Sequence, residues 1–151
     1  MNKNLTPAAT VLVLRDSKDG IEVLMVKRSK KPPFENLYVF PGGKIDEDDC
    51  HKDWRSYCDG HNDSTASEIL GLNSDGLSYW IACIRECFEE VGILLAKRKS
   101  GKKLNLEGHD KKKFDVYRRD LINQKISFLE ICEKEDLMLS TENIAPLSHW
   151  I

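Results

Sequence analysis

The sequence has no long apolar run, no cysteine pair of the Cys-x-x-Cys type and no excess of charge of one sign. A helix that crosses a bilayer needs about 20 predominantly apolar residues, and the apolar runs here are all much shorter. The N-terminal residues Met1–Pro7 lack the apolar block of a signal peptide. Five cysteines in that context favour reduced thiols. We therefore expect an intracellular chain without a membrane partner.

The balance of charge disfavours a protein that coats nucleic acid. Lys and Arg number 23, Asp and Glu 25, and the net charge is −2. A chain of 151 residues suffices for one domain, so residues 1–151 are taken as a single domain. Cys50, His51, Cys58 and His61 lie close together, but they lack the paired spacing of zinc modules, which favours ordinary loop residues.

The first third of the chain predicts short strands. The apolar and β-branched segment Ala8–Leu14 and the segment Ile21–Val26 flank turn residues at Asp16–Gly20, which predicts a β-hairpin. A third strand is predicted at Leu37–Phe40. It leads directly into Pro41–Gly43, whose small residues let a backbone approach an anion closely.

Two later segments have strongly biased charge. Residues 46–63 are locally −5, and the region to residue 76 reads as an excursion from the fold, either a lid or a partly ordered loop. Residues 97–119 are locally +7. They predict a solvated loop and the start of a helix that continues, with a break, to Cys132, and the alternative is a surface for a polyanion.

A helix is predicted between these two segments, with capping residues at Asn73, Ser74 and Asp75 and a left-handed end at Gly92. Its core-facing stripe consists of Leu77, Ile81, Ile84 and Phe88. Glu86, Glu89 and Glu90 share the opposite face. Exposed acids on a helix are common, but these three lie in the last two turns, where the helix dipole disfavours negative charge. Several carboxylates beside a glycine loop suit Mg²⁺ and a phosphate-linked substrate.

The segment Arg85–Ile93, Arg-Glu-Cys-Phe-Glu-Glu-Val-Gly-Ile, resembles the second half of the Nudix box, and Gly43 resembles the glycine that opens it. This resemblance implies an α/β/α sandwich with a mixed sheet, of the broad α/β (α+β) class. It also implies hydrolysis of a diphosphate bond with Mg²⁺ or Mn²⁺. The site residues that it implies are Glu89 and Glu90 as metal ligands, Glu86 as a third ligand or general base, Arg85 as the residue that orients a carboxylate, Gly42, Gly43 and Arg28 for phosphate, and Gly92 for structure.

The box departs from the family pattern. Asp49 lies where the first glutamate is expected, with Glu47 as the alternative, and 35 residues separate Asp49 from Arg85 where the family has seven. The chain thus carries a 28-residue insertion at about 48–76. Such a split box resembles the peroxisomal coenzyme A diphosphatase branch (Nudix motif 19 type), as do Asp53-Trp54 and His149–Ile151.

That branch implies cleavage of coenzyme A or acyl-coenzyme A into 3′,5′-ADP and (acyl-)4′-phosphopantetheine. The alternatives are another nucleoside-diphosphate substrate (a nucleotide sugar, a dinucleotide or a capped RNA) or a truncated, non-catalytic form. The sequence shows no strand after the helices, so we expect a C-terminally truncated sheet with exposed edges. Peroxisomal location is implied by the resemblance alone, because His149-Trp150-Ile151 is not a peroxisomal address. Otherwise we expect the cytoplasm or the mitochondrion.

Overall fold

The computed structural model of the chain describes residues 5–27 and 37–149. No helix among them is long and apolar enough to cross a bilayer. The strands are β1 (Ala8–Thr10), β2 (Leu14–Ser17), β3 (Gly20–Val23), β4 (Val26–Lys27), β5 (Tyr38–Val39), β6 (Gly42–Lys44), β7 (Cys58–Asp59), β8 (Ala96–Arg98) and β9 (Leu137–Ser140). The helices are η1 (Glu47–Cys50), η2 (Lys52–Ser56), α1 (Asp63–Leu70), α2 (Leu77–Val91), α3 (Lys111–Ile122), α4 (Phe128–Lys134) and η3 (Thr141–Asn143).

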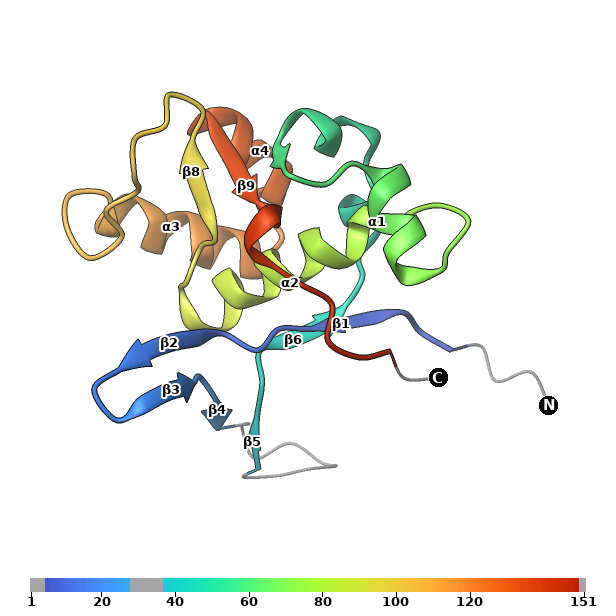
Figure 1. The fold of residues 1–151 in the computed structure, drawn as a ribbon. Helices are drawn as coiled ribbons and strands as arrows, with labels where there is room; N and C mark the ends of the chain where they lie inside the picture. Colours follow the sequence, from blue (N-terminus) through green and yellow to red (C-terminus); the bar gives the residue numbers. More distant parts are fainter. Residues whose placement is uncertain (1–4, 28–36, 150–151) are drawn as a thin grey trace.

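Helix α2 lies in the middle of the molecule, between the strand pair β1–β6 and the elements α3, α4, β8 and β9 (Figure 1). Its predicted apolar stripe is buried and packs with Trp54, Phe114, Phe128 and Leu139 in the larger core. A smaller core lies on its other side, where Ala82, Cys83 and Cys87 contact Ala9 and Val11. The helix is therefore covered on two faces, which fixes its orientation.

The predicted hairpin is real but its boundaries are different. The segment Ala8–Leu14 is divided, because β1 pairs antiparallel with β6 whereas β2 pairs with β3. Val11 extends the first pairing by donating its backbone N–H to Pro41 O at 2.9 Å. The chain therefore passes from pairing with β6 to pairing with β3 near Val13. The predicted single strand is divided because its first part pairs with residues more than 30 positions away. The third strand is confirmed as β5, which pairs with β4.

A three-stranded mixed sheet lies on the far side of α2. β9 is its middle strand, parallel to β7 and antiparallel to β8. The expectation that no strand follows the helices is therefore wrong. The segment Ala96–Arg98 has no apolar alternation and becomes a strand by pairing with the distant β9. The apolar run Leu137–Leu139 of β9 was not predicted as a strand. The break between the two later helices, α3 and α4, is confirmed.

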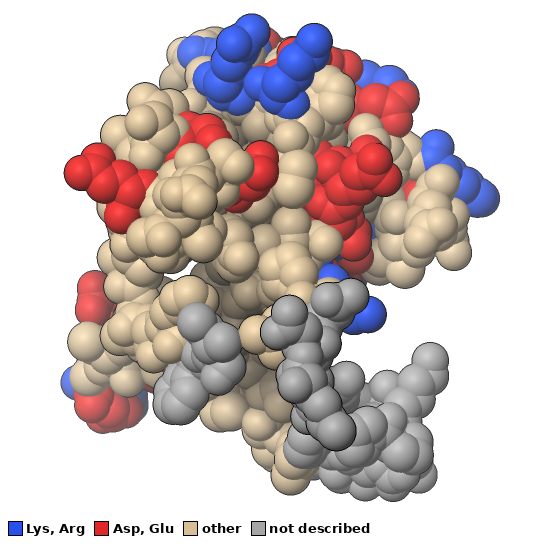
Figure 2. All heavy atoms as spheres, turned by 90° about the vertical axis from the view of Figure 1, so that its right-hand side faces the viewer, with Lys and Arg blue, Asp and Glu red and all other residues tan. Residues whose placement is uncertain are grey.

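The acidic region 46–76 is part of the fold, and the expectation of a lid or a partly ordered loop is wrong. It forms η1, η2, β7 and α1, and the Trp54 side chain is only 1% exposed. The indole Nε1–H donates to Asp48 O at 2.8 Å, and the ring contacts Phe128. Acidic side chains nevertheless remain on the outer face, on the side where α1 lies (Figure 2).

Some cations of the basic stretch 97–119 have internal carboxylate partners. Arg98 pairs with Asp110 and Glu135, Lys97 pairs with Asp59, and Lys113 pairs with Glu135. The expectation of a solvated loop and helix start is confirmed, because residues 99–103 and 111–113 are exposed. The ion pairs connect β8 and α3 to neighbouring elements. Apolar side chains are exposed on the strands that extend from the body: Leu14 on β2, Ile21 on β3 and Tyr38 on β5.

Candidate active site

Helix α2 presents its three carboxylates to other parts of the chain, so its polar face is only partly solvated. The side chains of Glu86 and Glu89 are 14% and 22% exposed, whereas Glu90 is exposed. The carboxylates of Glu86 and Glu89 accept hydrogen bonds from Arg85 of the same helix, and that of Glu90 accepts one from the backbone of Gly42. This arrangement contradicts the simple alternative of a solvated acidic face.

Arg85 is the buried cation of the site. Its Nε and Nη2 donate to the two carboxylate oxygens of Asp49 at 2.9 and 2.8 Å, a bidentate pair in which the side chains are 5% and 1% exposed. Its Nη1 donates to Glu86 at 3.0 Å and to Glu89 at 3.1 Å. Of the two acids that the sequence left open, the structure brings Asp49 to Arg85, whereas the side chain of Glu47 is exposed.

Strand β6 covers the carboxylate face of α2, and its three residues each meet one charged side chain. Gly42 N–H donates to Glu90 at 3.2 Å, and Lys44 C=O accepts from Arg85 Nη2 at 2.9 Å. Between them, a Cβ at Gly43 would overlap the carboxylate of Glu86. Glycine at this position therefore lets the strand lie directly against the helix.

The electrostatics of the cluster follow from its burial. Burial works against the charged form of Arg85, but its hydrogen bonds to Asp49 and the nearby charges of Glu86 and Glu89 outweigh burial and raise the pKa of the guanidinium. Burial also raises the pKa of the Glu86 carboxyl, with Arg85 opposing and the neighbouring Glu89 and Glu90 adding to the increase. Like charges thus crowd this face, and a cation bound there would relieve the crowding.

The two ends of α2 are held differently from the prediction. Gly92 confirms the left-handed end, with φ of 74° and an N–H that donates to Phe88 O. The start is capped from a distance: the Asp63 carboxylate accepts the N–H groups of Asp75 and Leu77, and Ser67 Oγ accepts that of Gly76. The prediction of caps at 73–75 is therefore wrong, because the capping side chains come from α1.

The donor set fits a hard divalent cation. Glu86, Glu89 and Glu90 supply carboxylate oxygens from consecutive turns, and the absence of a Cβ at Gly43 lets the Glu86 carboxylate lie directly against the glycine backbone. In this structure Glu86 and Glu89 are turned to Arg85 and Glu90 to Gly42, so within residues 5–27 and 37–149 no three ligating side chains meet at one point. Metal binding would replace some of these contacts. Arg28 lies outside the described residues.

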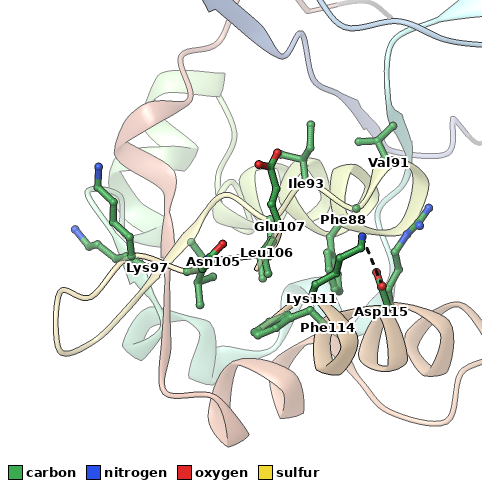
Figure 3. A pocket seen from close by; sticks show the side chains of 16 residues that line it. Phe88, Val91, Ile93, Lys97, Asn105, Leu106, Glu107, Lys111, Phe114 and Asp115 are labelled. Carbon is green, nitrogen blue, oxygen red and sulfur yellow. Dashed lines mark ion pairs between the residues drawn. The ribbon is translucent and has the colours of Figure 1, made fainter. Parts of the chain in front are cut away.

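A hollow of about 670 Å³ lies beside the C-terminal end of α2, between α3 and the loop that follows β8 (Figure 3). Phe88 and Phe114 form part of its apolar wall, and Lys111 pairs with Asp115 at 3.7 Å on its rim. Arg118 also lines it. The hollow and the carboxylate cluster therefore share the last turn of α2.

The sequence analysis did not identify two residues that contact the site, Lys44 and Arg118. Lys44 acts through its backbone carbonyl, which no side-chain pattern reveals. Arg118 donates to the backbone carbonyls at the end of α2. Its spacing is informative, because it lies four residues after the buried Phe114 and three before the buried Leu121, and therefore on the inner face of α3.

Comparisons with known proteins agree with this geometry. A family model described as NUDIX domain matches residues 4–143. The chain is 26% identical over 164 residues to the protein named acyl-coenzyme A diphosphatase NUDT19 of Xenopus laevis, covering 91% of this chain and 43% of that protein. It superposes on the crystal structure of a NUDIX hydrolase from Alicyclobacillus acidocaldarius with a TM-score of 0.68 and 21% identity, covering 93% of this chain and 59% of the other. The chain spans about half the length of these proteins, and the second likeness confirms the expected fold class.

Proposed function

Since this chain belongs to the NUDIX domain family, we propose that it is a metal-dependent hydrolase of a diphosphate bond. The observation that supports this most directly is the contact of β6 with the carboxylate face of α2. Gly42 and Gly43 lie against Glu90 and Glu86, so glycine backbone and clustered carboxylates are brought to one place. A phosphate-bearing substrate and a divalent cation require this combination.

The proposed roles follow from which groups are held and which are accessible. Glu89 and Glu90 are the proposed metal ligands, because they lie at the open end of the cluster. The bound cation would polarise the phosphorus centre and make a bound water more acidic. Arg85 keeps Glu86 and Glu89 oriented through Nη1. Glu86 is then either the third ligand or the group that accepts the proton of the attacking water.

The proposed substrate is coenzyme A or acyl-coenzyme A. The relative from Xenopus laevis is named as an acyl-coenzyme A diphosphatase, and its similarity covers 91% of this chain. The inserted segment, which prompted the same expectation, is built into the fold around Trp54. The products would be 3′,5′-ADP and the (acyl-)4′-phosphopantetheine fragment. Peroxisomal location remains a prediction from the same resemblance.

The test is Mg²⁺-dependent hydrolysis with product analysis. We expect coenzyme A cleavage that Glu90→Gln reduces by at least about 100-fold, since the variant removes a charged ligand but keeps the shape of the helix. Glu68→Gln, on the exposed surface of α1, is the matched control. Undiminished turnover in Glu90→Gln would contradict the assigned site. Hydrolysis of nucleotide sugars, dinucleotides or capped RNA without coenzyme A cleavage would overturn the substrate and keep the reaction.

The variant Glu86→Gln in the same assay separates the two roles of that residue. A ligand role predicts weaker metal binding, measured by calorimetry. A general-base role predicts a lower kcat with unchanged metal affinity.

A further inference from the structure

Negative charge is concentrated at the C-terminal end of α2, and the last turn of the helix has no basic residue to offset it. Three glutamates lie in its last two turns. The last carbonyls of a helix also lack intrahelical donors and carry the negative end of the dipole. Gly92 N–H satisfies Phe88 O, which leaves the carbonyls of Glu89 and Glu90 to be satisfied from elsewhere.

Arg118 of α3 supplies both missing donors. Its Nε donates to Glu89 O at 2.8 Å and its Nη2 donates to Glu90 O at 2.9 Å. The planar guanidinium presents these two N–H groups in a fixed fork, so one side chain sets the separation of two consecutive carbonyls. The positive charge also offsets the crowded carboxylates and the helix dipole at this end.

An aromatic contact holds α3 against α2 close to Arg118. Phe114, one turn before Arg118, is 3% exposed, and its ring meets that of Phe88 edge to face with centroids 6.3 Å apart. Phe88 is in turn one residue before Glu89. The aromatic contact and the guanidinium therefore hold adjacent parts of the same helical turn.

We propose that Arg118 is a positioning residue that fixes the last turn of α2 and thereby the carboxylates of Glu89 and Glu90. Glu89 is then held at two points: Arg85 Nη1 bonds its side chain at 3.1 Å, and Arg118 bonds its backbone at 2.8 Å. One part of this proposal rests on the proposed function: that the affinity for the metal depends on Arg118. The ordering of the helix end does not depend on that function.

The experiment compares Arg118→Gln with Arg119→Gln, a control one position along α3. Arg119 is exposed and pairs loosely with Asp120 at 3.7 Å. Two readouts are taken on the purified chain: amide hydrogen exchange of residues 88–93, and the dissociation constant of Mn²⁺. We expect Arg118→Gln to lower protection of residues 91–93 and to weaken Mn²⁺ binding by about tenfold, as loss of a residue behind the ligands does. Arg119→Gln leaves both unchanged.

The conservative variant separates positioning from stability. Arg118→Lys keeps the charge but brings a single ammonium to two carbonyls, so we expect its Mn²⁺ affinity to lie between those of wild type and Arg118→Gln. Equal exchange and equal Mn²⁺ affinity in the Gln variants of Arg118 and Arg119 would overturn the proposal. If Arg118→Gln loses protection but the wild type hydrolyses no diphosphate substrate, the role of Arg118 is supported. Only the proposed diphosphatase function is then contradicted.

Discussion

Arg85 determines how the acidic residues of the site are arranged. It comes from the polar face of α2, yet it is almost completely buried, because Asp49 and the carbonyl of Lys44 enclose it. Two of its three nitrogens are used on Asp49, and the third divides between Glu86 and Glu89. A buried guanidinium with this many acceptors holds the side chains around it in one arrangement.

The variant Asp49→Asn tests whether this ion pair stabilises the fold. The variant keeps the shape but removes the charge opposite Arg85, and breaking one side of a buried ion pair is strongly unfavourable. We expect the free energy of unfolding to fall by about 3 kcal/mol, measured by urea titration. Glu47→Gln, the exposed alternative two residues earlier, is expected to change it by less than about 0.5 kcal/mol. Equal losses in the two variants would refute Asp49 as the partner of Arg85.

Both ends of α2 are bonded by side chains from other elements. Asp63 and Ser67 of α1 cap its N-terminus, and Arg118 of α3 bonds its last carbonyls. The inserted segment therefore has a structural role, because α1 caps the N-terminus of the helix that carries the carboxylates. An insertion inside the box is compatible with a rigid site for this reason.

The prediction for this element is that Asp63→Ala destabilises the protein. Two backbone N–H groups, of Asp75 and Leu77, lose their acceptor, and the helix dipole loses a favourable charge. We expect a loss of about 1–2 kcal/mol in the free energy of unfolding. Asn73→Ala, at an exposed position where the sequence predicted a cap, is the control and is expected to be nearly neutral. The reverse order of the two effects would show that the cap lies at 73–75 after all.

The same helix shows what the sequence can and cannot predict. Its buried stripe and its glycine end were predicted correctly, because both depend on residues within one or two turns of each other. Three other features depend on residues 12 to 36 positions away. The N-terminal cap was predicted wrongly, the partner of Arg85 was left open between two acids, and the role of Arg118 was not predicted. Strand β8 was missed for the same reason: its short segment becomes a strand by pairing with the distant β9.

At the scale of the whole molecule, Glu135 joins the elements on the far side of α2. It lies between α4 and β9 and is 8% exposed. Arg98 of β8 and Lys113 and Tyr117 of α3 all donate to its carboxylate. Burial alone would raise the pKa of Glu135, but these three hydrogen bonds outweigh it and lower the pKa below the ordinary 4.5. The hydrogen bonds from Lys113 and Tyr117 connect α3, the helix that carries Arg118, to this carboxylate.

A pH-dependent stability follows from that shift. Because the pKa of Glu135 is lower in the folded chain than in the unfolded chain, its contribution is complete above about pH 4.5 and is lost as the pH falls through the folded-state value. We expect Glu135→Gln to be less stable than wild type by about 2 kcal/mol at pH 7, with the difference constant down to about pH 5 and shrinking below pH 4.5. Urea titrations at pH 3.5 to 7 measure it, with the exposed Glu133→Gln as the control. A difference that does not shrink at low pH would show that the carboxylate stabilises the fold through its shape and not through its charge, and the folded-state titration proposed for Glu135 would then be wrong.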